Sequence, residues 1–306
     1  MNSIAMYRAK RAGRRQVMLF DDSMRAGYLD RMELDRDIRL ALDSAQFEMY
    51  LQPLVYFGRG IVQNFEALIR WNHSRHGVLA PREFLPAVEQ NGLTNALGEW
   101  AFARCAEAAA SMCQIEPRMC IGVNVHPDQL LQPGFVASVI RVMAEADIPG
   151  DAMTIEIIEH AVMIDVGQTR RVLEELRSIG LSIAIDDFGT GYSNLDLLRR
   201  LPVDYIKIDR SFVAGLGTEP GDTQLVRMVL GLSQELGIEV IAEGGETAVQ
   251  ANVLRELGCR IGQGSLYSPP LPLPLAEAEA MLRQQAEAML RQQANPPSSD
   301  RIVPVI

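Results

Sequence analysis

The feature that most constrains this 306-residue chain is a regular alternation of short apolar stretches, rich in β-branched residues, with stretches of helical periodicity. The apolar stretches are typical of buried strands, and we expect eight of them between residues 47 and 263. Strands joined by helical crossovers run parallel, and eight such units in about 220 residues suit a closed barrel. No glycine-rich phosphate loop follows the first strand, which argues against an open dinucleotide-binding sheet.

The first two strands depart from the alternation. Residues 47–56 and 61–69 both have extended patterns, and only the turn from Gly58 to Gly60 separates them, which predicts a hairpin. One barrel strand is therefore expected to run antiparallel to the others. The predicted fold class is α/β: a TIM-like (β/α)8 barrel with one antiparallel strand, preceded by a short N-terminal helix-strand appendage.

The chain is expected to divide into five segments. A helix and a strand within the first segment cannot bury a core by themselves, and a connecting helix follows them. The barrel comes next, and after it an extended terminal helix and a Pro- and Ser-rich tail predicted to be disordered. The boundaries of these segments are 1–24, 25–45, 46–275, 276–294 and 295–306.

The terminal helix contains a perfect duplication. The octapeptide AEAMLRQQ occupies residues 278–285 and again residues 286–293. Eight residues advance a helix by about 80° beyond two full turns. The two copies therefore face different directions, and no coiled-coil seam is predicted.

Composition excludes several classes of protein. Hydrophobic residues make up 48% and charged residues 22%, as in ordinary globular proteins, and no apolar run is long enough to span a bilayer. No secretory signal is visible, so a cytoplasmic location is expected. The net charge of -10 argues against duplex nucleic acid, although a phosphate ligand held by metal ions stays open. The cysteines have neither zinc spacing nor a disulfide framework; they are Cys105, Cys113, Cys120 and Cys259.

Polar residues recur where the predicted strands end. The carboxyl ends of barrel strands meet at one mouth, where active sites are built, so these side chains are expected to converge. The set comprises Glu66, Asn124, Glu156, Asp186, Asp187, Lys207, Glu243 and Gln263. A turn or a surface ion pair could explain any single member, but not all of them together.

Five of these side chains are carboxylates, which would repel one another strongly unless cations neutralised them. An oxygen-only ligand set, without His or Cys, favours Mg²⁺ or Mn²⁺ over zinc. Asp186 and Asp187 are adjacent at one strand end, so one can bridge two ions while the other serves the second. The sequence thus predicts a two-metal site suited to phosphoryl hydrolysis.

Seven motifs, in order along residues 30–275, resemble EAL domains, the cyclic-di-GMP phosphodiesterases. They are FEALIRW at 65–71, VNVHPDQL at 123–130, EIIE at 156–159, DDFGTGYSNL at 186–195, YIKIDRSFV at 205–213, VIAEGGET at 240–247 and GQGSLYSPP at 262–270. The resemblance implies hydrolysis of one 3′ phosphodiester bond of cyclic-di-GMP to give linear pGpG. It also implies two Mg²⁺ or Mn²⁺ ions and a homodimer.

The resemblance also implies a role for each matching residue. The metal ligands would be Glu66, Asn124, Glu156, Asp186, Asp187 and Glu243. The catalytic group would comprise Lys207, which positions the attacking water, Glu243 and Gln263 in the water network, and Glu159, which holds the DDFGTGYS loop. The substrate contacts would be Gln52, Leu68 and Arg70, and an arginine fork suits a phosphate.

The first 24 residues resemble the closing helix and strand of a diguanylate cyclase (GGDEF) domain. The signature loop of that family would lie upstream, and nothing here supplies it, so cyclase activity is not expected. An upstream GGDEF or sensor domain is an expected partner of the chain.

The chain departs from the EAL pattern at Ile158, His160, Gly245 and Ser265, none of them a metal ligand. Gly245 could loosen the loop beside Glu243, because glycine adds backbone freedom. His126 and His160 are interpreted as polar loop residues and not as metal ligands.

Two other functions stay open at this point. The first is an inactive EAL-type receptor that binds cyclic-di-GMP without cleaving it. The second is a Schiff-base aldolase that uses Lys207 as its nucleophile, which would require a depressed lysine pKa.

Overall fold

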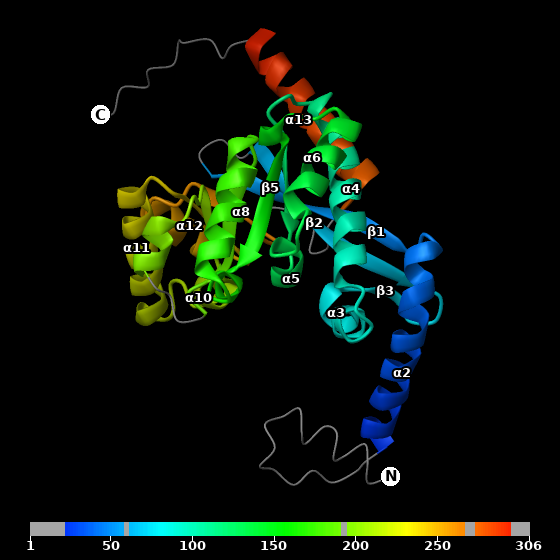
Figure 1. The fold of residues 1–306 in the computed structure, drawn as a ribbon. Coiled ribbons are helices and arrows are strands. Elements are labelled where there is room, and N and C mark those ends of the chain that lie inside the picture. The colour runs from blue at the N-terminus through cyan, green and yellow to red at the C-terminus, as the bar shows by residue number, and fades with distance from the viewer. Residues whose placement is uncertain (1–21, 58–60, 191–194, 267–272, 295–306) are drawn as a thin grey trace, which may run out of the picture. The chain divides into compact units, whose positions relative to one another are not determined.

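The computed structural model describes residues 22–57, 61–190, 195–266 and 273–294 (Figure 1). The predicted N-terminal appendage and the predicted disordered tail lie outside these ranges. The chain divides into two compact units. One comprises residues Met1–Glu48 and Ile69–Leu97, and the other comprises Met49–Leu68 and Gly98–Ile306.

A closed ring of eight strands organises the second unit, with β1 and β2 contributing residues to both units. Around the ring the order is β1-β9-β8-β7-β6-β5-β4-β2, and β2 pairs with β1 to close it. The strands are β1 (Phe47–Tyr56), β2 (Ile61–His73), β4 (Cys120–Asn124), β5 (Met153–Ile158), β6 (Ser182–Phe188), β7 (Tyr205–Ile208), β8 (Glu239–Ala242) and β9 (Ile261–Gly262). Successive pairs from β2 to β9 are parallel, whereas β1 pairs antiparallel with β9. The prediction of a TIM-like barrel with one antiparallel strand is confirmed.

Helices alternate with the parallel strands, as the sequence pattern predicts (Figure 1). The main ones are α4 (Thr94–Cys113), α6 (Phe135–Ala146), α8 (Val166–Ser178), α9 (Leu195–Arg200), α11 (Pro220–Leu236) and α12 (Ala248–Glu256). Their ends carry the expected signals: Asp165 caps the start of α8, and Gly237 ends α11 in the left-handed region at φ 69°. Short helices α5 (Pro127–Leu130), α7 (Glu159–Val162) and α10 (Arg210–Ala214) were not predicted. Among the described helices, none combines the length and apolar character that a membrane crossing needs.

The terminal helix α13 (Leu275–Ala294) follows β10 (Leu273–Pro274), which pairs antiparallel with β1. The first copy of the duplicated octapeptide supplies its anchors, because Ala278 and Leu282 are buried. The side chain of Gln285 bonds to both the N–H and the carbonyl of Val62, at 2.7 and 2.9 Å. This amide satisfies backbone groups of β2 that would otherwise need another strand.

The first unit contains α2 (Asp22–Asp43), β3 (Gly77–Leu79) and α3 (Pro81–Gln90), with the start of β1 and the end of β2. Its core is aromatic: the ring of Trp71 lies 5.7 Å from that of Phe47 and 6.0 Å from that of Phe84. The carboxylate of Asp37 on α2 lies 3.5 Å from Nε2 of the buried His73. The connecting helix expected over residues 25–45 begins earlier, at Asp22, and packs on α3.

Candidate metal centre and active site

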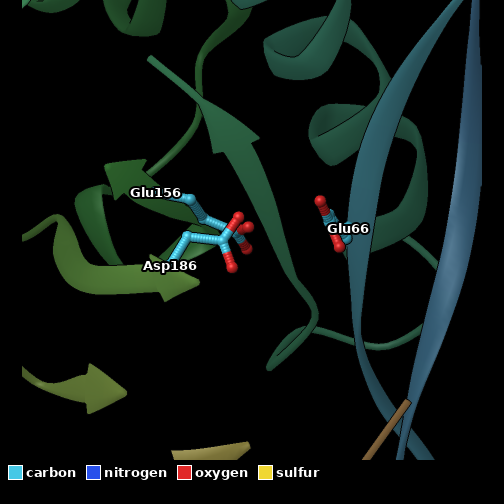
Figure 2. Close-up of side chains that lie close together, drawn as sticks. All are labelled: Glu66, Glu156 and Asp186. Carbon is cyan, nitrogen blue, oxygen red and sulfur yellow. The ribbon is translucent and has the colours of Figure 1, made fainter. Parts of the chain in front are cut away.

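Three carboxylates from three different strands face one another inside the barrel mouth (Figure 2). Glu66 comes from β2, Glu156 from β5 and Asp186 from β6, and all three are buried. Their positions follow from the strand register, since Asn124 pairs with Glu156 and Ile158 with Asp186 at neighbouring strand ends. The predicted convergence of acids is therefore present in the fold.

Lys207 on β7 stands at the centre of this group and is fully buried, with an exposed fraction of 0%. Its Nζ lies 2.7 Å from an oxygen of Glu156 and 2.7 Å from one of Glu243. The distances to Glu66 and Asp186 are 3.0 and 3.3 Å. One ammonium thus offsets four carboxylates, which leaves the site with an excess of negative charge.

The environment shifts the pKa values of these groups in opposing ways. Burial alone would lower the pKa of Lys207, but the four surrounding carboxylates outweigh it and hold that pKa well above its ordinary value. Burial raises the pKa of Glu243 to about 8; Lys207 opposes this rise, whereas Asp186 and Glu66 add to it. Burial likewise raises the pKa of Glu156 well above its ordinary value. The carboxylates therefore need more positive charge than Lys207 provides.

Asp186 and Asp187 join the same site because the strand is irregular there. Neighbouring strand residues normally point to opposite faces. Here the register between β6 and β7 shifts between Ile185 and Phe188, and Asp187 adopts a left-handed conformation with φ 54°. This bulge turns the second carboxylate toward the first. The strand also continues to Phe188, beyond the end at Ile185 that the sequence suggested.

Amide side chains orient Glu66. Asn124 donates to its Oε1 at 2.8 Å, and Gln263 donates to its Oε2 at 2.6 Å. Burial acts to raise the pKa of Glu66, but Lys207 and these two amides lower it below its ordinary value. The Nε2 of Gln263 also reaches Gln52 at 3.0 Å, while its buried Oε1 has no partner among the described atoms.

The carboxylates form two groups that fit two divalent cations. Ligand oxygens of Glu66, Glu156 and Asp186 lie within 4.8 Å of one another, and so do those of Asp186, Asp187 and Glu243. Asp186 belongs to both groups, as a bridging ligand would. The donors are all oxygens, which suits hard cations, and the free Oε1 of Gln263 adds a further acceptor. The residues present therefore fit a pair of divalent ions.

Glu159, at the start of α7, reaches the loop that follows Asp187. Its Oε2 accepts a hydrogen bond from the N–H of Gly189 at 3.1 Å. The hydroxyl of Thr190 in turn donates to the carbonyl of Asp187 at 2.9 Å. The loop is therefore tied at Gly189 to the start of α7, while residues 191–194 lie outside the described structure.

The three residues predicted to contact substrate lie on the first two strands. Gln52 is on β1 and bonds to Gln263, and Leu68 is half-buried on β2. Arg70, also on β2, belongs to the other compact unit and donates to the carbonyl of Ile69 at 2.9 Å. The roles of all three in substrate binding stay predictions.

Two residues at the site escaped the sequence analysis. Asp209 caps the start of α10 by accepting from the N–H of Ser211, and its proximity adds to the burial that raises the pKa of Asp187. Its sequence signal was a carboxylate two residues beyond Lys207. Gly122 pairs in register with Glu66, and a Cβ there would collide with the carboxylate of Glu156. Its missing side chain makes room for that glutamate.

We expect Gly122→Ala to reduce the hydrolysis of cyclic-di-GMP that the resemblance implies by at least about 100-fold while the barrel still folds. The reason is that the new methyl group displaces Glu156 from Lys207. Metal affinity measured by calorimetry should fall in parallel. Gly231→Ala on α11 is the matched control, since a Cβ there meets nothing within 4 Å. Equal activity of the two variants would show that the space beside Glu156 does not matter.

The two histidines near the motifs lie at short helices, and His160 and Ser265 are two of the positions that depart from the EAL pattern. His126 caps α5, since its Nδ1 accepts from the N–H of Asp128 at 3.2 Å. His160 is exposed on α7, and Ser265 is exposed after β9. Neither histidine belongs to a metal-binding group among the described residues.

Comparison with known proteins agrees with this geometry. The model of the EAL domain family matches residues 35–270. The chain belongs to the EAL domain family. It is 34% identical over 281 residues to the cyclic di-GMP phosphodiesterase NbdA of Pseudomonas aeruginosa, covering 92% of this chain and 36% of that protein. It is 36% identical over 269 residues to MucR of the same organism, a bifunctional diguanylate cyclase/cyclic di-GMP phosphodiesterase, covering 88% of this chain and 39% of MucR.

Solved EAL structures share the fold. The PaMucR phosphodiesterase in complex with c-di-GMP has a TM-score of 0.77 and 34% identity, covering 80% of this chain and 99% of that one. The EAL domain of Mycobacterium smegmatis DcpA has a TM-score of 0.67 and 37% identity, covering 78% of this chain and 98% of that domain. By contrast, this chain spans well under half of the length of the curated relatives NbdA and MucR.

Proposed function

We propose that this EAL domain hydrolyses cyclic-di-GMP to linear pGpG with two divalent cations, Mg²⁺ or Mn²⁺. The observation that carries the proposal is the pair of carboxylate groups that share Asp186 beside a buried, charged Lys207. The EAL relatives named as phosphodiesterases and the solved complex with c-di-GMP support the substrate.

The reaction consumes one water. A bond forms between the water oxygen and one phosphorus, the bond from that phosphorus to the 3′ oxygen breaks, and the 3′ oxygen takes a proton. The cations, when bound, neutralise the carboxylates and polarise the phosphate and the attacking water. Glu66, Asn124, Glu156 and Asp186 would hold the first ion, and Asp186, Asp187 and Glu243 the second.

The chain's own residues orient the reactants. Without bound cations the four carboxylates hold the pKa of Lys207 well above its ordinary value, so its ammonium donates hydrogen bonds, and we assign it the task of positioning and activating the attacking water. Gln263 has an unused acceptor, Oε1, to which a water could donate. Glu159 holds the loop after Asp187 through Gly189.

The two alternative functions make different demands on the site. A Schiff-base aldolase needs a neutral lysine nucleophile, whereas four carboxylates raise the pKa of Lys207. An inactive receptor would bind the nucleotide without releasing pGpG. The acidic residues implied by the EAL resemblance are all present, which favours the enzyme over the receptor.

The decisive experiment is a turnover assay on cyclic-di-GMP with Mg²⁺ or Mn²⁺ and with excess EDTA. We expect pGpG in stoichiometric yield with either cation and none with the chelator. Tight binding of the nucleotide with no pGpG in any metal would favour the receptor. Trapping of a carbonyl compound on Lys207 by borohydride would favour the aldolase.

Some further properties are also proposals. We infer that a homodimer forms and that a GGDEF or sensor domain precedes the barrel, the first 24 residues being a GGDEF remnant. The relative MucR, named as a bifunctional diguanylate cyclase/cyclic di-GMP phosphodiesterase, supports the second inference. A cytoplasmic location is part of the same proposal.

A further inference from the structure

The loop between β8 and α12, residues 243–247, carries Glu243 into the second carboxylate group. Backbone bonds tie it to both neighbouring strands. The N–H of Glu243 bonds to the carbonyl of Ile208, the last residue of β7, at 3.1 Å, and the N–H of Gly245 bonds to the carbonyl of Gln263, directly after β9, at 3.0 Å. The position of Glu243 therefore depends on how this loop is held.

Gln250 binds the remainder of the loop from within α12. Its Oε1 accepts from the N–H of Glu246 at 2.9 Å and of Thr247 at 2.8 Å. Its Nε2 donates to the carbonyl of Ala214, the last residue of α10, at 3.2 Å. With an exposed fraction of 7%, this side chain is buried, so water competes little for these bonds.

The link to α10 reaches the other side of the metal site. α10 begins at Arg210, directly after Asp209, whose carboxyl lies close enough to Asp187 to affect its pKa. Gln250 thus connects the loop that carries Glu243 to the helix that starts beside Asp187. The bonds of its side chain go to backbone groups that lie outside the group Asp186, Asp187 and Glu243.

The loop needs such a tie because Gly244 and Gly245 are consecutive. Glycine has more backbone freedom than other residues, so the sequence alone does not hold the loop in one conformation. Gly244 has φ 70°, and a Cβ there would collide with the side chain of Arg210. The loop therefore lies directly against the first residue of α10, while Gln250 bonds to the last.

We propose that Gln250 is a positioning residue that holds the loop carrying Glu243 against α10 and thereby sets the affinity of the group Asp186, Asp187 and Glu243 for its cation. The inference rests on the proposed two-metal function. It assigns to a residue outside the site the task of keeping one ligand in place.

The test uses Gln250→Glu in the full chain. The carboxylate still accepts from Glu246 and Thr247, but an oxygen replaces the donor that faces Ala214, so the tie to α10 is lost. Loss of one such bond predicts that the Kd of the weaker Mn²⁺ site, measured by calorimetry without substrate, rises about fivefold. The metal concentration that gives half-maximal turnover should rise by the same factor, with kcat restored at saturating Mn²⁺.

Thr247→Val is the matched control. Thr247 Oγ1 accepts from the N–H of Gln250 at 3.3 Å, so its loss weakens the start of the same helix and leaves the bond to Ala214 intact. We expect a lower Tm in this variant with wild-type Mn²⁺ affinity. Gln250→Met, which removes all three bonds, should weaken Mn²⁺ binding at least as much as Gln250→Glu.

Three outcomes would overturn the proposal. Wild-type Mn²⁺ affinity in the Gln250 variants would show that the tie does not position Glu243. Equal loss of affinity in Thr247→Val would make the effect one of helix stability, and unfolding of both Gln250 variants would make the residue a folding determinant. A wild type that binds two Mn²⁺ ions but does not cleave the nucleotide contradicts the proposed function alone, because calorimetry still tests Gln250.

Discussion

Replacing Lys207 by methionine is expected to abolish measurable hydrolysis and to destabilise the metal-free chain strongly. The variant keeps the length of the side chain but removes the cation that all four carboxylates share. Removing one partner of a buried ion network costs about 3–5 kcal/mol, and loss of a group that positions the water costs at least about 100-fold in turnover. Chemical denaturation and the pGpG assay measure the two effects.

The loss of folding stability in Lys207→Met should depend on the pH and on whether Mn²⁺ is present. Carboxyls whose folded pKa is raised, such as Glu243 at about 8, favour the folded state at low pH and lose that contribution as pH rises through the folded pKa. Without Lys207 the pKa values rise further. The deficit of Lys207→Met relative to wild type should therefore shrink as pH falls from about 8 to about 5, and added Mn²⁺ should also reduce it.

Arg177→Met is the control for loss of one cation. Arg177 forms an exposed ion pair with Asp204 at 2.8 Å. Asp204 directly precedes β7, so the pair lies at the opposite end of that strand from the carboxylate site. Exposed pairs contribute at most about 1 kcal/mol, so stability and turnover should change little. Turnover of Lys207→Met near the wild-type rate would contradict the proposed positioning of water.

The second large effect is expected from Glu66→Gln. This change preserves shape but removes a charge from the first carboxylate group, and the new amide nitrogen faces the amides of Asn124 or Gln263. Turnover should fall by at least about 100-fold, and the affinity of one Mn²⁺ site by at least about tenfold. Calorimetry with Mn²⁺ should resolve the loss at one site.

Measuring the Tm of Glu66→Gln without and with Mn²⁺ separates its effect on metal binding from its effect on packing. Without metal, the variant loses the ion pair with Lys207 and places an amide donor against another donor, so the Tm should fall; with Mn²⁺ the gain in Tm should be smaller than in wild type. Glu239→Gln, at the opposite end of strand β8 and bonded to Arg260 at 3.1 Å, is the control and should behave as wild type. If Glu66→Gln retained near-normal turnover, the two-metal assignment would be wrong.

The strand and helix pattern predicted most of the barrel because burial imposes it locally. Residues 47–56 and 239–242 were predicted as strands with the bounds that the structure has. The predictions failed for pieces too short to have a period, such as α7, α10 and β10, which contacts elsewhere in the fold stabilise. The first helix was also longer than its apolar pattern indicated.

The sequence by itself determined which side chains reach the barrel mouth, because the carboxyl ends of all parallel barrel strands lie at the same face of the barrel. It also determined the hard-oxygen character of the candidate metal site. Tertiary structure alone decided how those groups meet: the bulge that turns Asp187 beside Asp186, and the space that Gly122 leaves for Glu156. The physical reason is that register, bulges and close approaches arise from pairing between distant segments, which no local pattern records.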